Sequence, residues 1–199
     1  VEPLTRLILV AFGLKMASSF VRYFFTVDVY GTGDALRYDK VGAEIANSFH
    51  AGRIPLSDLV PSGTGTPFIE GFTGLLYTVT GPSRLGGFLV FSWLSFFGLF
   101  LFHRAALRGM PEGDQRRYAL LVLFLPSLLF WPSSIGKEGL MMLALGACAY
   151  GAARDLERQA AGWAPLLAGL GLAYLVRPHV PVVVLAALGV AFLFRRTGR

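Results

Sequence analysis

Charged residues are scarce in this chain. Asp, Glu, Lys and Arg make up 15% of its 199 residues, whereas an average soluble domain has about 25%. Hydrophobic residues make up 54% and the mean hydropathy is +0.59. The apolar residues come in blocks of about 15–20, close to the roughly 20 that a bilayer-spanning helix needs. This composition favours an all-α, polytopic transmembrane helical bundle over a soluble bundle with a large core.

Cysteine is almost absent, and several site patterns are missing altogether. Cys148 is the single cysteine, which excludes an intrachain disulfide and a cysteine-based metal site. It lies inside an apolar block and is expected to be a small packing residue. The three histidines lack metal-ligand spacing, and no G-x-S-x-G motif of a serine hydrolase is present.

The net charge of +6 does not indicate a nucleic-acid-binding protein. No run of Lys and Arg is interleaved with aromatic residues, and the basic residues lie at the ends of the apolar blocks. That distribution is typical of membrane topology signals. We therefore expect membrane lipid, and no nucleic acid, among the partners.

Six apolar blocks are predicted to span the membrane, and the whole chain, 1–199, is expected to form one transmembrane domain. The segment 27–84 is polar and is predicted to be a long loop. Its apolar stretch 67–81 is too short to span comfortably, so we expect an interfacial or re-entrant helix there. The blocks lie at about 7–26, 85–102, 118–135, 138–153, 163–176 and 180–194.

Arginine positions orient these six spans. Excess Lys and Arg in short loops mark the cytoplasmic side, so we expect a multi-pass protein of a bacterial plasma membrane with a cytoplasmic N-terminus. Loop 27–84, the Lys137-Glu138 tip and the Arg177-Pro178-His179 corner are then extracytoplasmic and converge on one face. The cytoplasmic side receives ten of the eighteen basic residues: Arg6, Arg104, Arg108, Arg116, Arg117, Arg154, Arg158, Arg195, Arg196 and Arg199.

An amphipathic helix is predicted to begin at Asp34. Apolar residues from Tyr38 onward recur at helical spacing, and Gly52 and Pro55 follow as helix-ending residues. Asp34 either caps this helix or supplies a carboxylate that removes a proton or holds a metal at the membrane surface. Tyr38 and Asp39 are candidate substrate contacts, and the alternative for Asp39 is a solvated helix face.

Four charged residues near the outer face and in the first span have two interpretations each. Glu138 begins a predicted helix, whose positive end favours an acid, and Lys137 beside it is either an interface anchor or a site residue. Arg177 either snorkels or offers a fork-shaped cation to a phosphate. Lys15 lies near the middle of the first span, with Arg22 on the same face. A charge at that depth is a functional hypothesis by default, and the alternatives are an internal pair with an acid and a pore-facing structural lysine.

The order of these features resembles the GT-C class of integral membrane glycosyltransferases, which use polyprenyl-phosphate-linked sugars. Three segments carry the resemblance: the outer loop GDALRYDKVGAEIANSFHAGRIP, the interfacial stretch TPFIEGFTGLLYTVTGPSRLGG and the hairpin PSLLFWPSSIGKEGLMMLALGACAYGAAR. In this class the first outer loop carries an essential acid, which Asp34 matches. A second acid often sits at the hairpin between the third and fourth spans, which Glu138 matches.

The resemblance implies a function and roles for these residues. It implies sugar transfer from a polyprenyl-phosphate donor to a glycan, lipid or protein acceptor, by the N-terminal module of a longer chain. Asp34 would be the base and Glu138 an acceptor-orienting or metal-binding acid, with a divalent metal ion left open as cofactor. Arg177, Lys137 and His179 would bind the phosphate. The alternative is a non-catalytic scaffold, subunit, or lipid or solute carrier of envelope assembly.

Overall fold

The computed structural model describes residues 2–156 and 162–197, and within these ranges it contains helices and turns but no strand. The all-α prediction is therefore confirmed. In chain order the elements are α1 (Glu2–Phe24), the π-helix η1 (Phe25–Tyr30), α2 (Asp34–His50), the 3₁₀-helix η2 (Leu56–Leu59), α3 (Thr66–Thr80), α4 (Arg84–Gly109), α5 (Gln115–Phe124), α6 (Pro126–Phe130), α7 (Lys137–Leu156), α8 (Trp163–Val176) and α9 (Val180–Thr197).

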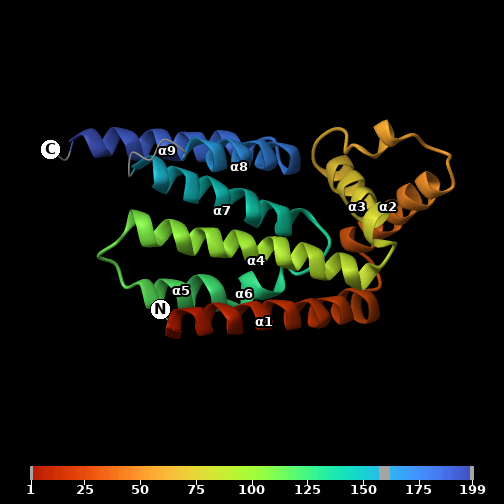
Figure 1. Ribbon diagram of the computed structural model, residues 1–199, viewed down its shortest axis with the longest axis horizontal. Helices are drawn as coiled ribbons and strands as arrows, with labels where there is room; N and C mark the ends of the chain where they lie inside the picture. Colours follow the sequence, from red (N-terminus) through yellow and green to blue (C-terminus); the bar gives the residue numbers. More distant parts are fainter. Residues whose placement is uncertain (1, 157–161, 198–199) are drawn as a thin grey trace.

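The long helices α1, α4, α7, α8 and α9 lie side by side, and α2 and α3 form a separate pair at one end of them (Figure 1). The chain reverses direction from α4 to α5, from α7 to α8 and from α8 to α9. As a result η1, the turn at 131–136 and the turn at 177–179 all lie at the end that carries α2 and α3. These are the segments that the sequence places together on one face.

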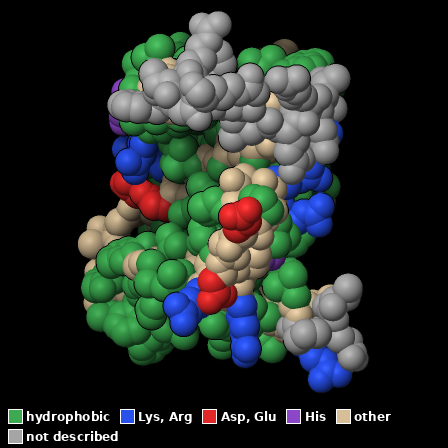
Figure 2. Space-filling view, turned by 90° about the vertical axis from the view of Figure 1, so that its left-hand side faces the viewer, with side chains coloured by type: hydrophobic (Ala, Val, Ile, Leu, Met, Phe, Trp, Pro, Cys, Tyr) green, Lys and Arg blue, Asp and Glu red, His purple; other side chains and the backbone are tan. Residues whose placement is uncertain are grey.

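The opposite end carries the turn between α4 and α5. Figure 2 looks onto this end, where Lys and Arg side chains lie around apolar surface. By their positions in the last two turns of α4, the first turn of α5 and the last turn of α7, the arginines here are Arg104, Arg108, Arg116, Arg117 and Arg154. These five of the basic residues that orient the predicted spans are thus grouped at one end of the helices.

Two helices of the described chain are long and apolar enough to cross a membrane. They are Leu4–Tyr30, of 27 residues, and Arg84–Gly109, of 26 residues. Trp163–Val176 and Val180–Ala191 are shorter apolar helices. Large apolar side chains are exposed on several of these helices, among them Leu9, Phe20, Trp93, Val183 and Leu193. Exposed apolar surface on helices of this length weakly indicates association with a membrane.

The block predicted as a single span over 118–135 is not one helix. Helix α5 ends at Phe124, Leu125 adopts an extended conformation (φ −60°, ψ 121°), and α6 begins at Pro126 and ends at Phe130. Proline has no backbone N–H, and its ring excludes the helical conformation from the residue before it. The expected third span is therefore two short helices followed by the turn 131–136.

Helices α4, α7 and α8 pack through glycine. A Cβ atom added to Gly146 of α7 would collide with the carbonyl oxygen of Gly98 on α4, and one added to Gly169 of α8 would lie 2.7 Å from Sγ of Cys148. Small residues let helix backbones approach closely. Cys148 is buried with 3% of its surface exposed, which agrees with the packing role predicted for it.

The pair α2 and α3 is joined to the long helices by a buried aromatic and aliphatic cluster. Its residues come from α2, α3, α4, the turn 131–136, α7 and α8, so this cluster holds α2 over the start of α7. The cluster contains Ala35, Tyr38, Ala46, Phe68, Ile69, Tyr77, Phe88, Phe91, Ile135, Leu140 and Val176.

Candidate functional site

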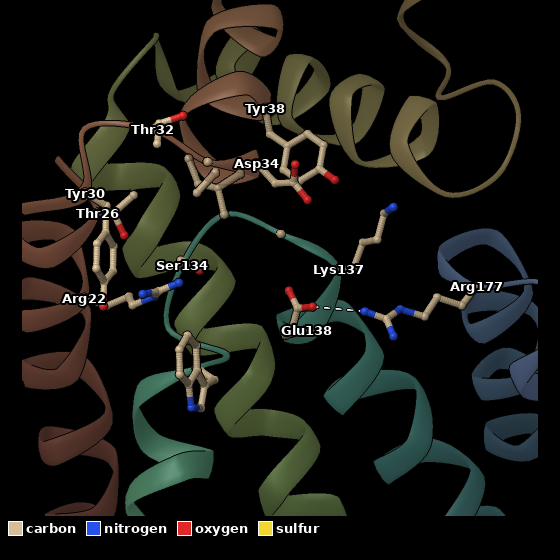
Figure 3. A pocket seen from close by; sticks show the side chains of 15 residues that line it. Arg22, Thr26, Tyr30, Thr32, Asp34, Tyr38, Ser134, Lys137, Glu138 and Arg177 are labelled. Atoms are coloured by element: carbon tan, nitrogen blue, oxygen red, sulfur yellow. Dashed lines mark hydrogen bonds and ion pairs between the residues drawn. The ribbon is translucent and has the colours of Figure 1, made fainter.

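A polar cavity of about 550 Å³ opens where η1, the start of α2, the turn 131–136, the start of α7 and the end of α8 meet (Figure 3). It brings together residues that are far apart in the sequence, including Asp34 with Glu138. Three cationic and two acidic side chains line it. The lining residues are Arg22, Thr26, Tyr30, Thr32, Gly33, Asp34, Ala35, Tyr38, Trp131, Ser134, Ile135, Gly136, Lys137, Glu138 and Arg177.

Asp34 is the first residue of α2 and not its cap. Gly33 occupies the N-cap position with a φ of 130°, which favours glycine, and no side chain caps the helix. The N-cap interpretation of Asp34 is therefore wrong. Asp34 is exposed at the cavity, and its side chain makes no hydrogen bond or ion pair with any described residue. Its carboxylate is thus available to a ligand.

Glu138 and Arg177 face each other across the mouth of the cavity. Nη2 of Arg177 donates a hydrogen bond of 3.1 Å to Oε1 of Glu138. The side chain of Arg177 is 44% exposed and that of Glu138 is 51% exposed. Ion pairs with this exposure contribute only about 0–1 kcal/mol to stability. Arg177 can therefore exchange this carboxylate for the anion of a ligand at small cost.

Lys137 ties two helix starts together beside the cavity. Its Nζ donates a hydrogen bond of 3.0 Å to Oγ1 of Thr66, the first residue of α3. Lys137 itself is the first residue of α7. Its charge therefore stays at the cavity wall while one of its protons is used within the protein.

Arg22 and Thr26 bring buried, unpaired polar atoms to the opposite wall. The Arg22 guanidinium lies 5.0 Å from the ring centre of Phe130 and 4.9 Å from that of Trp131. Its Nε and Nη1 atoms are buried without a hydrogen-bond partner, and so is Oγ1 of Thr26, a residue that is 3% exposed. Arg22 was a candidate from the sequence and Thr26 was not, although its position one helical turn beyond Arg22 was an available signal.

Asp39 does not line the cavity. Its Oδ1 accepts a hydrogen bond of 2.7 Å from the Tyr77 hydroxyl, and its Oδ2 accepts one of 2.6 Å from Nε of Arg84. The residue is 7% exposed, so its expected position on a solvated face is wrong. Burial and the bond to the Asp39 carboxylate raise the pKa of Tyr77 well above its usual value of 10.0. The three residues link α2 and α3 to the start of α4.

Lys15 is also outside the cavity, and its partners are not acids. Nζ of Lys15 is fully buried and donates to the carbonyl oxygens of Leu128, at 2.7 Å, and Leu129, at 3.2 Å. These carbonyls belong to α6, which is too short to satisfy them within the helix. The expected pair of Lys15 with an acid is therefore replaced by a cation at a helix C-terminus.

Of the two remaining candidates, Tyr38 lines the cavity and His179 does not. Tyr38 lines the cavity from α2 with its side chain 2% exposed. His179 lies in the turn between α8 and α9, is exposed, and does not line the cavity. Trp131, Ser134 and Tyr30, which the sequence analysis did not single out, complete the wall.

An apolar groove of about 310 Å³ lies next to the polar cavity, between α6 and α7. The two hollows share Trp131, Glu138 and Arg177. Beyond these shared residues, the groove is lined by Ser127, Leu128, Pro132, Met141, Met142 and Leu145. The site therefore joins a charged compartment to a hydrocarbon-like one.

The cavity offers few ligands to a metal ion. Over residues 2–156 and 162–197 no group of three or more His, Cys, Asp and Glu side chains is placed to hold one. Asp34 and Glu138 are the acids of the cavity lining, and Glu138 is already paired with Arg177. Because hard cations take several oxygen ligands, this donor set alone does not fit a divalent metal.

Comparisons with models of protein families, with curated proteins and with solved structures give no match.

Proposed function

We propose that this protein is a membrane glycosyltransferase that moves a sugar from a polyprenyl-phosphate donor to an acceptor hydroxyl. One observation carries the proposal: the polar cavity, with its unpaired Asp34 and three cations, adjoins the apolar groove and shares Trp131, Glu138 and Arg177 with it. A ligand that fills both compartments has an anionic head and a hydrocarbon tail. A sugar linked to a lipid phosphate has both parts and also a bond that can be transferred.

The proposed site lies at the extracytoplasmic face of a multi-pass, N-in membrane protein. In this arrangement the arginine-rich end of the helices faces the cytoplasm, as the distribution of basic residues in short loops favours. The pair α2 and α3 then lies on the outer surface, where an amphipathic helix is stable in the interface. The exposed apolar faces of α1, α4 and α9 contact lipid.

The proposed reaction uses the residues of the cavity directly. The Asp34 carboxylate accepts the proton of the acceptor hydroxyl as the hydroxyl oxygen attacks the anomeric carbon of the sugar. The bond from that carbon to the phosphate oxygen breaks, and the phosphate departs with the electron pair. The cationic side chains of Arg22, Lys137 and Arg177 stabilise the charge that develops on it. Glu138 orients Arg177, and no step is assigned to a metal ion.

The surroundings of Lys15 favour this function over that of a carrier. Carriers place substrate-binding charges near the middle of the membrane, and Lys15 is the deep charge that such a function would use. Its ammonium group is instead bound to the carbonyls of Leu128 and Leu129. The Asp34 carboxylate and the Arg22 guanidinium, which have no hydrogen-bond partner among the described residues, lie at the cavity, at one end of the helices.

The test is a transfer assay with the full chain in lipid vesicles. Polyprenyl-phosphate-linked mannose, glucose, galactose and arabinose are offered as donors with octyl glycosides as acceptors, and mass spectrometry measures glycosylated acceptor and released polyprenyl phosphate. We expect both products with at least one donor, and loss of both in Asp34→Asn. Equal product from Asp34→Asn and the wild type would contradict the role of Asp34, and a lack of product with every donor would contradict the enzyme.

A further inference from the structure

The last turns of the first helix carry a group of polar atoms that the protein itself leaves unpaired. Nε and Nη1 of Arg22 and Oγ1 of Thr26 are buried without a hydrogen-bond partner among the described residues, and both side chains line the polar cavity. An unmade hydrogen bond at a buried donor is unfavourable, so a native structure retains few such groups. Three of these atoms on one cavity wall point to a ligand that satisfies them.

The other two cations of the cavity are already engaged. Arg177 donates to Glu138, and Lys137 donates to Thr66. Arg22 is different, because the neighbours of its guanidinium are the rings of Phe130 and Trp131. These rings fix the plane of the guanidinium and stabilise its charge without using its N–H groups. Arg22 is thus held in place and keeps donors for an anion.

Thr26 supplies a neutral donor beside this cation. It lies in η1, where α1 passes into a π-helix over Phe25–Tyr30. Such π-helical turns occur frequently at functional sites. A helical threonine usually donates to a carbonyl one turn earlier, as Thr73 does to Ile69. The Thr26 hydroxyl makes no such bond and is left for the cavity.

We propose that Arg22 and Thr26 form the seat of the phosphate group, with the guanidinium and the hydroxyl donating hydrogen bonds to its non-bridging oxygens. An arginine fork and a hydroxyl are a chemically suitable set for a phosphate oxyanion. Figure 3 shows the seat on the wall formed by α1 and η1, with Lys137 and Arg177 on the other side of the cavity. This assignment rests on the proposed function and moves the phosphate from Arg177 to Arg22.

Trp131 identifies the phosphate as that of a lipid. Its ring contacts the Arg22 guanidinium in the polar cavity, and the same residue lines the apolar groove. A phosphate held by Arg22 would therefore lie near Trp131, the residue past which a prenyl chain would run into the groove. Free phosphate would use the seat but leave the groove without an occupant.

The test is direct binding of a probe to the detergent-solubilised full chain, measured by isothermal titration calorimetry. Farnesyl phosphate is the probe, and farnesol and inorganic phosphate are the two half-probes. Arg22→Gln should weaken farnesyl phosphate binding by about 10- to 100-fold, the range expected for a hydrogen bond to a charged group. Farnesol binding should remain unchanged in this variant.

Thr26→Val separates a binding role from a structural one. Valine keeps the shape of threonine and removes a hydroxyl that has no protein partner, so the melting temperature should stay the same or rise. Farnesyl phosphate should nevertheless bind about 5- to 10-fold more weakly. Ser19→Ala is the matched control: Ser19 is fully buried, its hydroxyl is also unpaired, and it does not line the cavity. This control should leave the affinity unchanged.

The outcomes distinguish this inference from the proposed function. One contrary outcome is that Arg22→Gln and Thr26→Val bind farnesyl phosphate as tightly as the wild type while Arg177→Gln does not bind it. That result would overturn the seat and keep the lipid-phosphate site. Inorganic phosphate that binds as tightly as farnesyl phosphate, with the same dependence on Arg22, would keep the seat and overturn the lipid. A wild-type protein that binds neither compound would overturn both.

Discussion

Asp34 and Asp39 lie on the same helix, α2, and only one of them is bound by the protein. Asp39 is buried and accepts hydrogen bonds from Tyr77 and Arg84. Asp34 is exposed at the cavity, and no described residue donates to it. Two identical side chains on one helix therefore have separable roles, which amide substitutions can measure.

Asp34→Asn should lower sugar transfer by about 10²–10⁴-fold, the contribution of a positioned base. Its free energy of unfolding should change by less than about 0.5 kcal/mol, because the exposed carboxylate has no protein partner to lose. Asp39→Asn should do the reverse, with about 1–3 kcal/mol lost from stability because Arg84 loses its ionised acceptor. Transfer rates of the folded fraction and chemical denaturation in detergent check the pair. Equal effects of the two substitutions on rate would contradict the assignment.

Lys15→Met should destabilise the fold without affecting the site. Methionine fills similar volume but leaves the carbonyl of Leu128 without its donor, which should cost about 1–3 kcal/mol; the carbonyl of Leu129 keeps the Ser133 hydroxyl as a donor. Farnesyl phosphate affinity of the folded protein should stay within about twofold of wild type. A large loss of affinity with unchanged stability would show instead that the deep charge serves a ligand.

The apolar groove should respond to the length of the lipid chain. Ser127 is exposed on the groove wall, so Ser127→Trp should fill part of the groove without disturbing the core. If the indole occupies the surface that otherwise contacts two CH₂ groups of the prenyl chain, farnesyl phosphate should bind about tenfold more weakly. Dimethylallyl phosphate, whose chain is shorter, should bind as before. Ala191→Trp, at an exposed position of α9 that lines neither the cavity nor the groove, is the matched control. Equal losses for both probes would place the tail elsewhere.

The membrane orientation can be measured by labelling single cysteines in intact cells. Ser62 lies in the segment between α2 and α3, and Glu112 lies in the turn between α4 and α5, at the opposite end of the helices; both are exposed. Ser62→Cys should react with a membrane-impermeant maleimide, and Glu112→Cys should react only after the cells are opened. Cys148 is buried and should give little background. Reaction of Glu112→Cys in intact cells would contradict the N-in orientation.

Local sequence patterns predicted much of the helical structure. The helix from Asp34 begins where its apolar spacing begins and ends before Gly52, and Trp163–Val176 coincides with the predicted block. The meeting of Asp34, Glu138 and Arg177 at one cavity was also an expectation from the sequence. These features depend on residues near one another in the chain or on the alternation of helix direction.

The roles of Asp39 and Lys15 depend on contacts that the sequence does not reveal. Arg84, the partner of Asp39, is 45 positions away along the chain, and the carbonyls bound by Lys15 are more than 110 positions away. The latter become available because α6 ends at Phe130 and because Pro132, four residues after Leu128, has no N–H to donate. Hydrophobic spacing reports which face of a helix is buried, and it does not report which distant polar group that face meets.

Trp131 gives the site an optical reporter of its own. The chain has three tryptophans; Trp93 lies on α4 and Trp163 at the start of α8, and neither lines the polar cavity or the groove. Trp131 lines both hollows and stacks with the Arg22 guanidinium. In a protein with phenylalanine at positions 93 and 163, the indole emission would come from the one point where headgroup and tail meet. Its wavelength would then follow the exchange of water for hydrocarbon as the groove fills.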